Sequence, residues 1–322
     1  MLSRHVSSWG EGMTIAPQQQ AEGLWAITSY FNPAYYRRRL ANYRVFREHL
    51  TVPLVAVELA YGPHFELNDN DAEILVQLRG GDVLWQKERL LNLALAVLPN
   101  TCRKVVWVDC DIVYESNDWA ANVCHMLDHF PFGQTFSHAC YMPRDWKPGE
   151  LRPTQTQLTL PSVALGVASG LAAEELEYPK FATGFSWAAR RELLHQHGFY
   201  DGCILGAGDR AMVSAGYGCF DHAPPYNRMN DREKVRYLAW AKPFHKAVGS
   251  AIGFVEGNIY HLWHGEMRDR GYGERHKFFA PFNFDPFADI VIDRNGCWRW
   301  NTHKPEMHEY VRKYFASRKE DG

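Results

Sequence analysis

Two aspartates separated by one residue follow an apolar segment, in the sequence Val-Val-Trp-Val-Asp-Cys-Asp over residues 105–111. Neither acid can leave water cheaply unless a cation neutralises it. Hard divalent cations such as Mg²⁺ and Mn²⁺ bind carboxylate oxygens, commonly together with phosphate oxygens of a substrate. Asp109 and Asp111 therefore predict a metal or diphosphate site. The alternative is that they only cap the turn that follows.

Two histidines lie close together further along the chain, in Tyr-His-Leu-Trp-His-Gly over residues 260–265. One imidazole nitrogen can complete a metal site that is otherwise made of oxygen ligands. The alternative for His261 and His264 is a pair of core histidines packed around Trp263.

A third candidate acid, Asp209, follows Gly206-Ala207-Gly208, a turn that lets the backbone approach a ligand closely. A carboxylate at this position can act as a general base toward a hydroxyl group. It can also cap the helix expected over residues 210–215, and the two roles are compatible.

Alternating strand-like and helix-like segments position these residues. Apolar runs predict strands over residues 24–30, 54–59, 72–78 and 104–114, and helical spacing predicts helices over 35–50 and 85–98. This alternation predicts a mostly parallel sheet with helices on both faces, with ligands at the carboxyl ends of its strands. The pattern resumes at residues 181–195, 203–217 and 253–264, and residues 143–173 are expected to form a long connection.

The composition is that of a globular protein. The chain has 322 residues, of which 46% are hydrophobic and 22% charged, and its net charge of −2 argues against a protein that coats polyanions. Seven dispersed cysteines with no Cys-x-x-Cys pair predict free thiols in a reducing compartment. The sequence has no signal-like start and no apolar run long enough to span a membrane, so we expect a cytoplasmic protein without a membrane span.

Four motifs occur in an order that resembles the GT-A fold glycosyltransferases of the inverting, galactosyltransferase-like type. They are the Asp-Cys-Asp that ends a strand, Phe-Ala-Thr-Gly-Phe-Ser at 181–186, Gly-Ala-Gly-Asp at 206–209 and the histidine segment at 260–265. The resemblance covers roughly residues 22–277. It implies a GT-A type, Rossmann-like α/β domain with a nucleotide-binding half over 22–116 and an acceptor half over 117–277. A loose tail over 1–21 would precede it, and an aromatic-rich cover over 278–322 would pack on it.

The same resemblance implies a site. Asp109, Asp111 and His264, with His261 beside them, would hold Mn²⁺ or Mg²⁺, and Asp209 would be the catalytic base. A nucleotide-sugar, UDP-linked by the same resemblance, would be contacted by residues at strand ends and in basic segments: Thr28, Ser29, Glu58, Lys87, Arg89, Asp109, Arg268 and Arg275. Arg268, Arg270 and Arg275 would neutralise the leaving diphosphate. For each of the charged side chains the alternative is a solvated surface residue.

The expected function is therefore transfer of a hexosyl or pentosyl group to an acceptor hydroxyl, with inversion. One alternative is a haloacid-dehalogenase-like phosphohydrolase with Asp109 as nucleophile, because Asp-x-Asp-x-Val fits its signature literally. A sugar nucleotidyltransferase and a non-catalytic carbohydrate- or protein-binding module are two others. The sugar and the acceptor are not readable from the sequence, and the arginines of residues 37–47 leave a nucleic-acid acceptor open.

Overall fold

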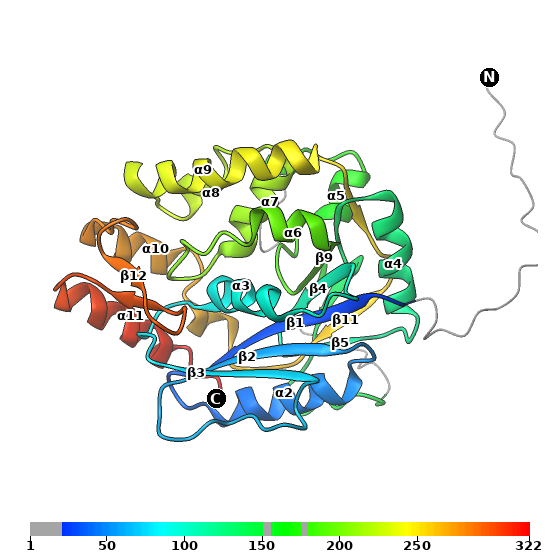
Figure 1. Ribbon diagram of the computed structural model, residues 1–322, viewed down its shortest axis with the longest axis horizontal. Coiled ribbons are helices and arrows are strands. Elements are labelled where there is room, and N and C mark those ends of the chain that lie inside the picture. Colours follow the sequence, from blue (N-terminus) through cyan, green and yellow to red (C-terminus); the bar gives the residue numbers. More distant parts are fainter. Residues whose placement is uncertain (1–20, 151–155, 157, 176–179) are drawn as a thin grey trace, which may run out of the picture.

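A seven-stranded sheet forms the centre of the computed structural model, which describes residues 21–150, 156, 158–175 and 180–322 (Figure 1). The strand order is β10-β6-β9-β4-β1-β2-β3, and β9 alone runs antiparallel to its neighbours β4 and β6. The strands are β1 (Leu24–Phe31), β2 (Leu54–Ala60), β3 (Ile74–Arg79), β4 (Lys104–Val108), β6 (Phe132–Gln134), β9 (Ser186–Arg190) and β10 (Ile252–Phe254). The predicted α/β class with a mostly parallel sheet is confirmed.

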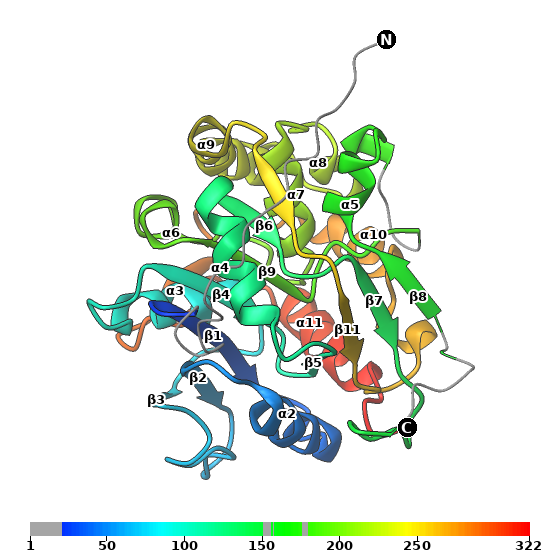
Figure 2. The ribbon, with the colours of Figure 1, turned by 90° about the vertical axis from the view of Figure 1, so that its right-hand side faces the viewer.

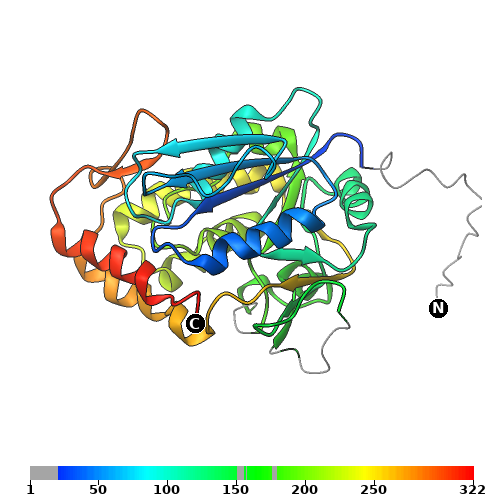
Figure 3. The same ribbon diagram turned by 90° about the horizontal axis from the view of Figure 1, so that it is seen from below.

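Helices cover both faces of this sheet. Side chains alternate between the two faces along each strand, and on the buried strands both sets are apolar, so each face needs a covering layer. On β4, Val105 and Trp107 belong to one hydrophobic cluster and Val106 and Val108 to the other. The first cluster is covered by α3 (Lys87–Val97), α6 (Arg191–His197), α7 (Gly208–Tyr217) and α9 (Asp231–Val248). The second is covered by α2 (Arg37–His49) and α4 (Trp119–His129), and α2 lies along the sheet in Figure 3.

A second, four-stranded sheet stands beside the first (Figure 2). Its order is β5-β11-β7-β8, with β5 (Ile112–Tyr114), β7 (His138–Tyr141), β8 (Leu158–Pro161) and β11 (Asn258–His261). The prediction of one continuous strand over residues 104–114 is therefore wrong. The chain leaves the first sheet after Val108 and enters the second at Ile112, and the backbone N–H of Ile112 donates to the carbonyl of Asp109 to close the turn between them.

Residues 143–173, expected as a long connection, contain regular structure as well. They include β8 and the helix α5 (Val163–Ala168), whose N-cap is Ser162. The part of this prediction that falls on residues 151–155 and 157 lies outside the described residues.

The last part of the chain packs back onto the sheet. It contains α10 (Glu274–Phe279), the hairpin β12 (Ile290–Ile292) and β13 (Trp298–Trp300), and α11 (Pro305–Ser317). Phe315 of α11 makes an edge contact with Phe31 at the end of β1 and stacks on Trp85, with ring centroids 6.1 and 6.2 Å apart. Helix α11 is thereby fixed next to the carboxyl end of β1.

All seven cysteines are free thiols, as the sequence predicts. None of the helices in the described ranges combines the length and the apolar character that crossing a membrane requires.

Helix α9 is the longest helix of the structure, and the sequence analysis did not predict it. The short helix α8 (Ala223–Tyr226) lies just before it. The Asn230 side chain accepts the backbone N–H of Glu233, and the Glu233 carboxylate accepts the backbone N–H of Asn230. This is a complete capping box, which satisfies two backbone donors at the helix start.

We expect Asn230→Ala to lower the free energy of unfolding by about 1 kcal/mol, because the cap is lost. The measurement is urea denaturation followed by circular dichroism. Lys242→Ala, at an exposed position of the same helix, is the control. Equal stability of the two variants would show that the capping box does not stabilise the fold.

Candidate active site

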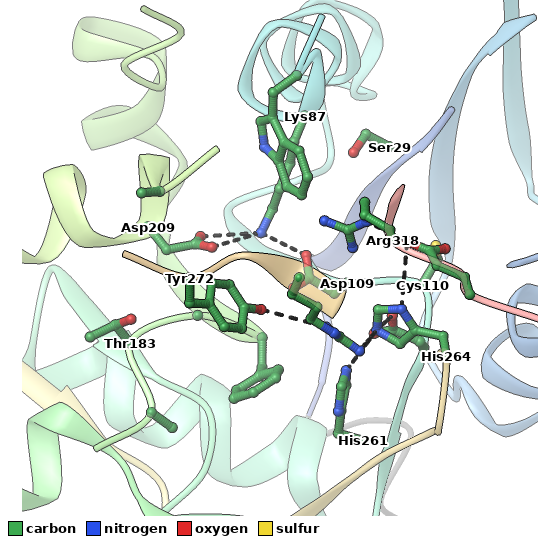
Figure 4. A pocket seen from close by; sticks show the side chains of 18 of the residues that line it. Ser29, Lys87, Asp109, Cys110, Thr183, Asp209, His261, His264, Tyr272 and Arg318 are labelled. Atoms are coloured by element: carbon green, nitrogen blue, oxygen red, sulfur yellow. Dashed lines mark hydrogen bonds and ion pairs between the residues drawn. The ribbon is translucent and has the colours of Figure 1, made fainter. Parts of the chain in front are cut away.

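A cavity of about 190 Å³ opens at the carboxyl ends of β1 and β4, where the two sheets meet (Figure 4). Its walls come from segments far apart in the sequence. They include Ser29 of β1, the Asp109–Asp111 corner, the turn before α7, and the residues that follow β11. The aspartate pair, the histidine segment and Asp209 all line this one cavity.

Asp111 and the two histidines converge on a common point. The Asp111 Oδ2 lies 3.0 Å from His264 Nε2, and the two Nε2 atoms of His261 and His264 are 3.0 Å apart. One ligand atom from each of the three residues falls within 4.8 Å of the others. Strand pairing explains the convergence, because β11 runs antiparallel to β5 with His261 opposite Ile112.

These three residues suit a divalent cation. The Asp111 Oδ1 is buried and has no hydrogen-bond partner among the described residues. Although burial acts in the opposite direction, positive charge on His264 and on Arg270 holds the pKa of Asp111 below its usual range. Burial lowers the pKa of His261 well below its ordinary value, so its ring is neutral. Metal ligands must be deprotonated, so a cation that binds here would displace any proton from the His264 nitrogen that it contacts.

Asp109, which we expected among the metal ligands, faces a lysine instead. Lys87 at the start of α3 places its Nζ 2.6 Å from Asp109 Oδ1 and 3.0 Å from Asp209 Oδ2. Burial raises the pKa of Asp109 to about 6, with Asp209 and Asp111 adding to the effect and Lys87 opposing it. The pKa of Lys87 is held well above its usual value by the two carboxylates, although its burial opposes this. Asp109 therefore lies outside the group formed by Asp111 and the histidines.

Asp209 does not cap α7. The N-cap position belongs to Ala207, which has a left-handed backbone with φ of 70°, and no side chain caps the helix. The Asp209 carboxylate points instead into the cavity, towards Lys87. A side chain added to Gly184 would lie 3.0 Å from its Oδ2, so Gly184 permits this orientation.

Two buried arginines line the same cavity. Arg270 lies 2.9 Å from His264 Nε2, and Arg275 donates to the hydroxyl of Tyr314 at 2.6 Å. Within the described part of the chain, neither guanidinium forms an ion pair with a carboxylate. Buried cations are normally paired, so these two arginines favour an anionic ligand.

Four of the residues that we expected to contact the nucleotide lie outside the cavity wall. The Thr28 hydroxyl donates to the carbonyl of Val108, and Glu58 accepts the backbone N–H groups of Glu66 and Leu67. Arg89 pairs with Asp201 at 3.0 Å, and Arg268 is exposed. None of these four residues lines the cavity. Of the predicted donor contacts, Ser29, Lys87, Asp109 and Arg275 do.

Several cavity residues were not anticipated from the sequence. They include Asn42, Trp85, Arg210, Tyr226, Arg318 and Glu320. Arg39, Arg44 and Arg47 from the basic segment pair with Glu320, Asp71 and Glu73, respectively. Three of the five arginines of this segment are therefore neutralised by carboxylates of the same chain.

No protein-family model and no curated protein matches the chain. Among solved structures it is similar to glucosyl-3-phosphoglycerate synthase from Mycobacterium tuberculosis in complex with Mn²⁺, UDP and glucosyl-3-phosphoglycerate. That similarity has 14% identity and a TM-score of 0.42, and it covers 86% of each chain. The chain is also similar to S. aureus TarS 1-349, at 12% identity over 80% of this chain and 63% of that one, with a TM-score of 0.36. Similarity of this degree leaves the function to be inferred from the side chains of the cavity.

Glu88 follows Lys87 in the first turn of α3 and lies next to Gly208 of α7. A side chain added to Gly208 would lie 2.2 Å from Glu88 Oε1, and that oxygen has no hydrogen-bond partner among the described residues. Burial raises the pKa of Glu88 from 4.5 to about 8. The folded chain therefore binds a proton at Glu88 that the unfolded chain releases above about pH 4.5.

We expect Glu88→Gln to stabilise the protein in a pH-dependent way. A carboxyl whose pKa is raised on folding costs stability progressively as the pH increases from about 4.5 to about 8. The variant should match the parent near pH 4.5 and exceed it at pH 8 by a few kcal/mol in free energy of unfolding. Urea denaturation across this range measures the difference, with Glu192→Gln at an exposed position of α6 as the control. Parallel pH curves for parent and variant would contradict the assignment.

Proposed function

We propose that this chain is a metal-dependent glycosyltransferase that moves a sugar from a UDP-sugar to an acceptor hydroxyl, with inversion. The observation that carries the proposal is the convergence of three features in one cavity. These are the Asp111–His261–His264 group, two buried arginines that no carboxylate of the described residues pairs with, and the carboxylate of Asp209. A metal–diphosphate donor requires the first two features, and activation of a hydroxyl requires the third. The choice of uridine rests on the motif resemblance.

The donor would bind through its diphosphate. Asp111, His261 and His264 would hold Mn²⁺ or Mg²⁺, which when bound supplies positive charge next to the phosphate oxygens. Arg270 and Arg275 lie in the segment that follows the histidines and are positioned to pair with the same oxygens. As the bond between the anomeric carbon and the diphosphate oxygen breaks, these guanidinium groups stabilise the charge that develops on the leaving group.

The acceptor would be activated by Asp209. Its carboxylate accepts the proton of the attacking hydroxyl while the new bond to the anomeric carbon forms. Lys87 holds this carboxylate in place by pairing with both Asp209 and Asp109. The base and the leaving group then lie on opposite faces of the sugar, and this arrangement produces inversion.

Two alternatives fit the structure less well. The phosphohydrolase alternative places its nucleophile on the first strand of the sheet, whereas β1, β2 and β3 all precede β4 here. A nucleotidyltransferase needs a glycine-rich, basic loop after the first strand, and no glycine follows β1 before α2. Hydrolysis of a generic phosphomonoester by the purified chain would support the phosphohydrolase alternative instead.

We expect UDP with Mn²⁺ to raise the melting temperature of the protein more than GDP, CDP or ADP with Mn²⁺. Asp111→Asn should abolish this metal-dependent stabilisation, because it removes the anionic ligand of the metal group. Asp69→Asn, at an exposed turn, should leave it unchanged. A thermal-shift titration measures all three. Stabilisation by GDP alone would overturn the choice of uridine, and an unchanged UDP response in Asp111→Asn would overturn the metal site.

We expect Asp209→Asn to reduce turnover by about 10²–10⁴-fold, because general-base catalysis contributes roughly that much. Binding of UDP should change little, since the metal group and Arg270 remain intact. Turnover and UDP affinity are measured on the same preparation, and the anomeric configuration of the product is determined by NMR. Near-normal turnover would exclude Asp209 as the base, and a product with retained configuration would exclude inversion.

A further inference from the structure

Two histidines of α4, His125 and His129, form an exposed pair outside the cavity. They are four residues apart, so both project from the same face of the helix, one turn apart. The centroids of their imidazole rings lie 4.9 Å apart, and the rings meet edge to face. Both residues are exposed, whereas the other face of α4 is buried against the rest of the fold. No residue of α4 lines the cavity, so the pair is separate from the group formed by Asp111, His261 and His264.

The surroundings of this pair leave its ring nitrogens available. Among the residues that the structure describes, neither imidazole has a hydrogen-bond or ion-pair partner. Asp128, which lies between the two histidines in the sequence, pairs with Lys104 at 2.5 Å. The hydrogen bond from Lys104 lowers the pKa of Asp128, and the two imidazoles add to this effect, so an ionised carboxylate lies next to the rings. An imidazole with a free lone pair beside a negative charge is suited to bind a cation.

The helical turn that carries the pair is fixed against the sheet. Met126 packs on β6 and β10, where a side chain added to Gly133 or to Gly253 would collide with it. These two glycines therefore allow α4 to lie close to the strands. The backbone N–H of Phe130 donates to the carbonyl of Met126 and closes the last turn of the helix. The two imidazoles are thus held at one helical turn from each other before any ligand binds.

We infer that His125 and His129 form a second metal site, which binds a divalent ion with affinity for imidazole, such as Zn²⁺, Ni²⁺ or Cu²⁺. Imidazole nitrogen suits these ions, whereas Mg²⁺ and Mn²⁺ favour oxygen ligands. Two histidines at this spacing on one face of a helix can bind the same zinc ion. Within the described ranges, no further histidine, cysteine or acid completes a group of three ligand atoms here, so water would fill the remaining positions. The inference does not depend on the proposed function, because the pair lies outside the cavity.

The first experiment counts the Zn²⁺ ions bound by the full chain in equilibrium dialysis. We expect His125→Gln and His129→Gln each to bind one ion fewer than the parent, since loss of either ligand should weaken binding by about 10²-fold. The bond to the second imidazole forms within an existing complex, and an intramolecular bond of this kind adds affinity of that order. Zn²⁺ that binds to the Asp111 group is counted equally in all chains, so the difference reports the pair alone.

The control is His195→Gln on α6. His195 is exposed as well, but no histidine is three or four residues away from it. This variant should bind as many ions as the parent. Equal counts in the parent and the two α4 variants, or an equal loss in His195→Gln, would overturn the inference.

The second experiment measures retention of the untagged chain on a column of immobilised Ni²⁺. His261 and His264 are 3% and 6% exposed, so they cannot reach an ion held on a solid support. We expect the parent and His195→Gln to require imidazole for elution, and both α4 variants to elute earlier. Elution of the parent together with the α4 variants would overturn the inference. Circular dichroism of each variant confirms that the exposed substitution leaves the fold intact.

Discussion

The need to balance negative charge in a largely buried cavity governs this structure. Asp109, Asp111, Asp209 and Glu320 all line one space between the two sheets. Such a group is tolerated only if cations reach each carboxylate, because an unpaired buried charge is strongly destabilising. Lys87 forms ion pairs with Asp109 and Asp209, and Arg39 and Arg318 form ion pairs with Glu320. Asp111 has the two imidazoles beside it, and one of its buried oxygens finds no hydrogen-bond partner among the residues that the structure describes.

This balance determines where the elements lie. Helix α3 must start next to the carboxyl end of β4, since Lys87 is in its first turn and bridges Asp109, which follows β4, and Asp209, which is in the first turn of α7. Residues 318–321 must cross to α2, since Arg39 lies there. The corner at Asp109–Asp111 directs one carboxylate towards α3 and the other towards the second sheet. The two acids of one short motif consequently have different partners and opposite pKa shifts.

The sequence predicted β1, β2, β3 and β4 of the first sheet, because each is a short apolar run, but it did not predict β6, β9 and β10 as strands. It did not predict the break at Asp109, since the apolar segments Val105–Val108 and Ile112–Tyr114 lie only three residues apart and nothing in either segment shows that two different sheets bury them. Helix α9 was missed although the Asn230–Glu233 capping box was readable. At the site, motif order indicated Asp111, His261, His264 and Asp209 together. Thr28 and Glu58 show the limit of that reasoning, because a position at a strand end does not determine which way the side chain points. Glu320 had no sequence signal, since its neighbours are brought together only by the tertiary fold.

The separation of these partners along the chain has a consequence for how the protein is made. Lys87 and Asp209 are 122 residues apart, and Arg39 and Glu320 are 281 residues apart. During synthesis, β4 can pair with β1 early, but its other edge stays open until β9 has left the ribosome. An open strand edge of this kind is a site for association with other chains. Because Glu320 is the last of the lining residues to be synthesised, the charge balance of the cavity is completed late in folding, and a shortened nascent chain would carry the acids without their full set of counter-charges.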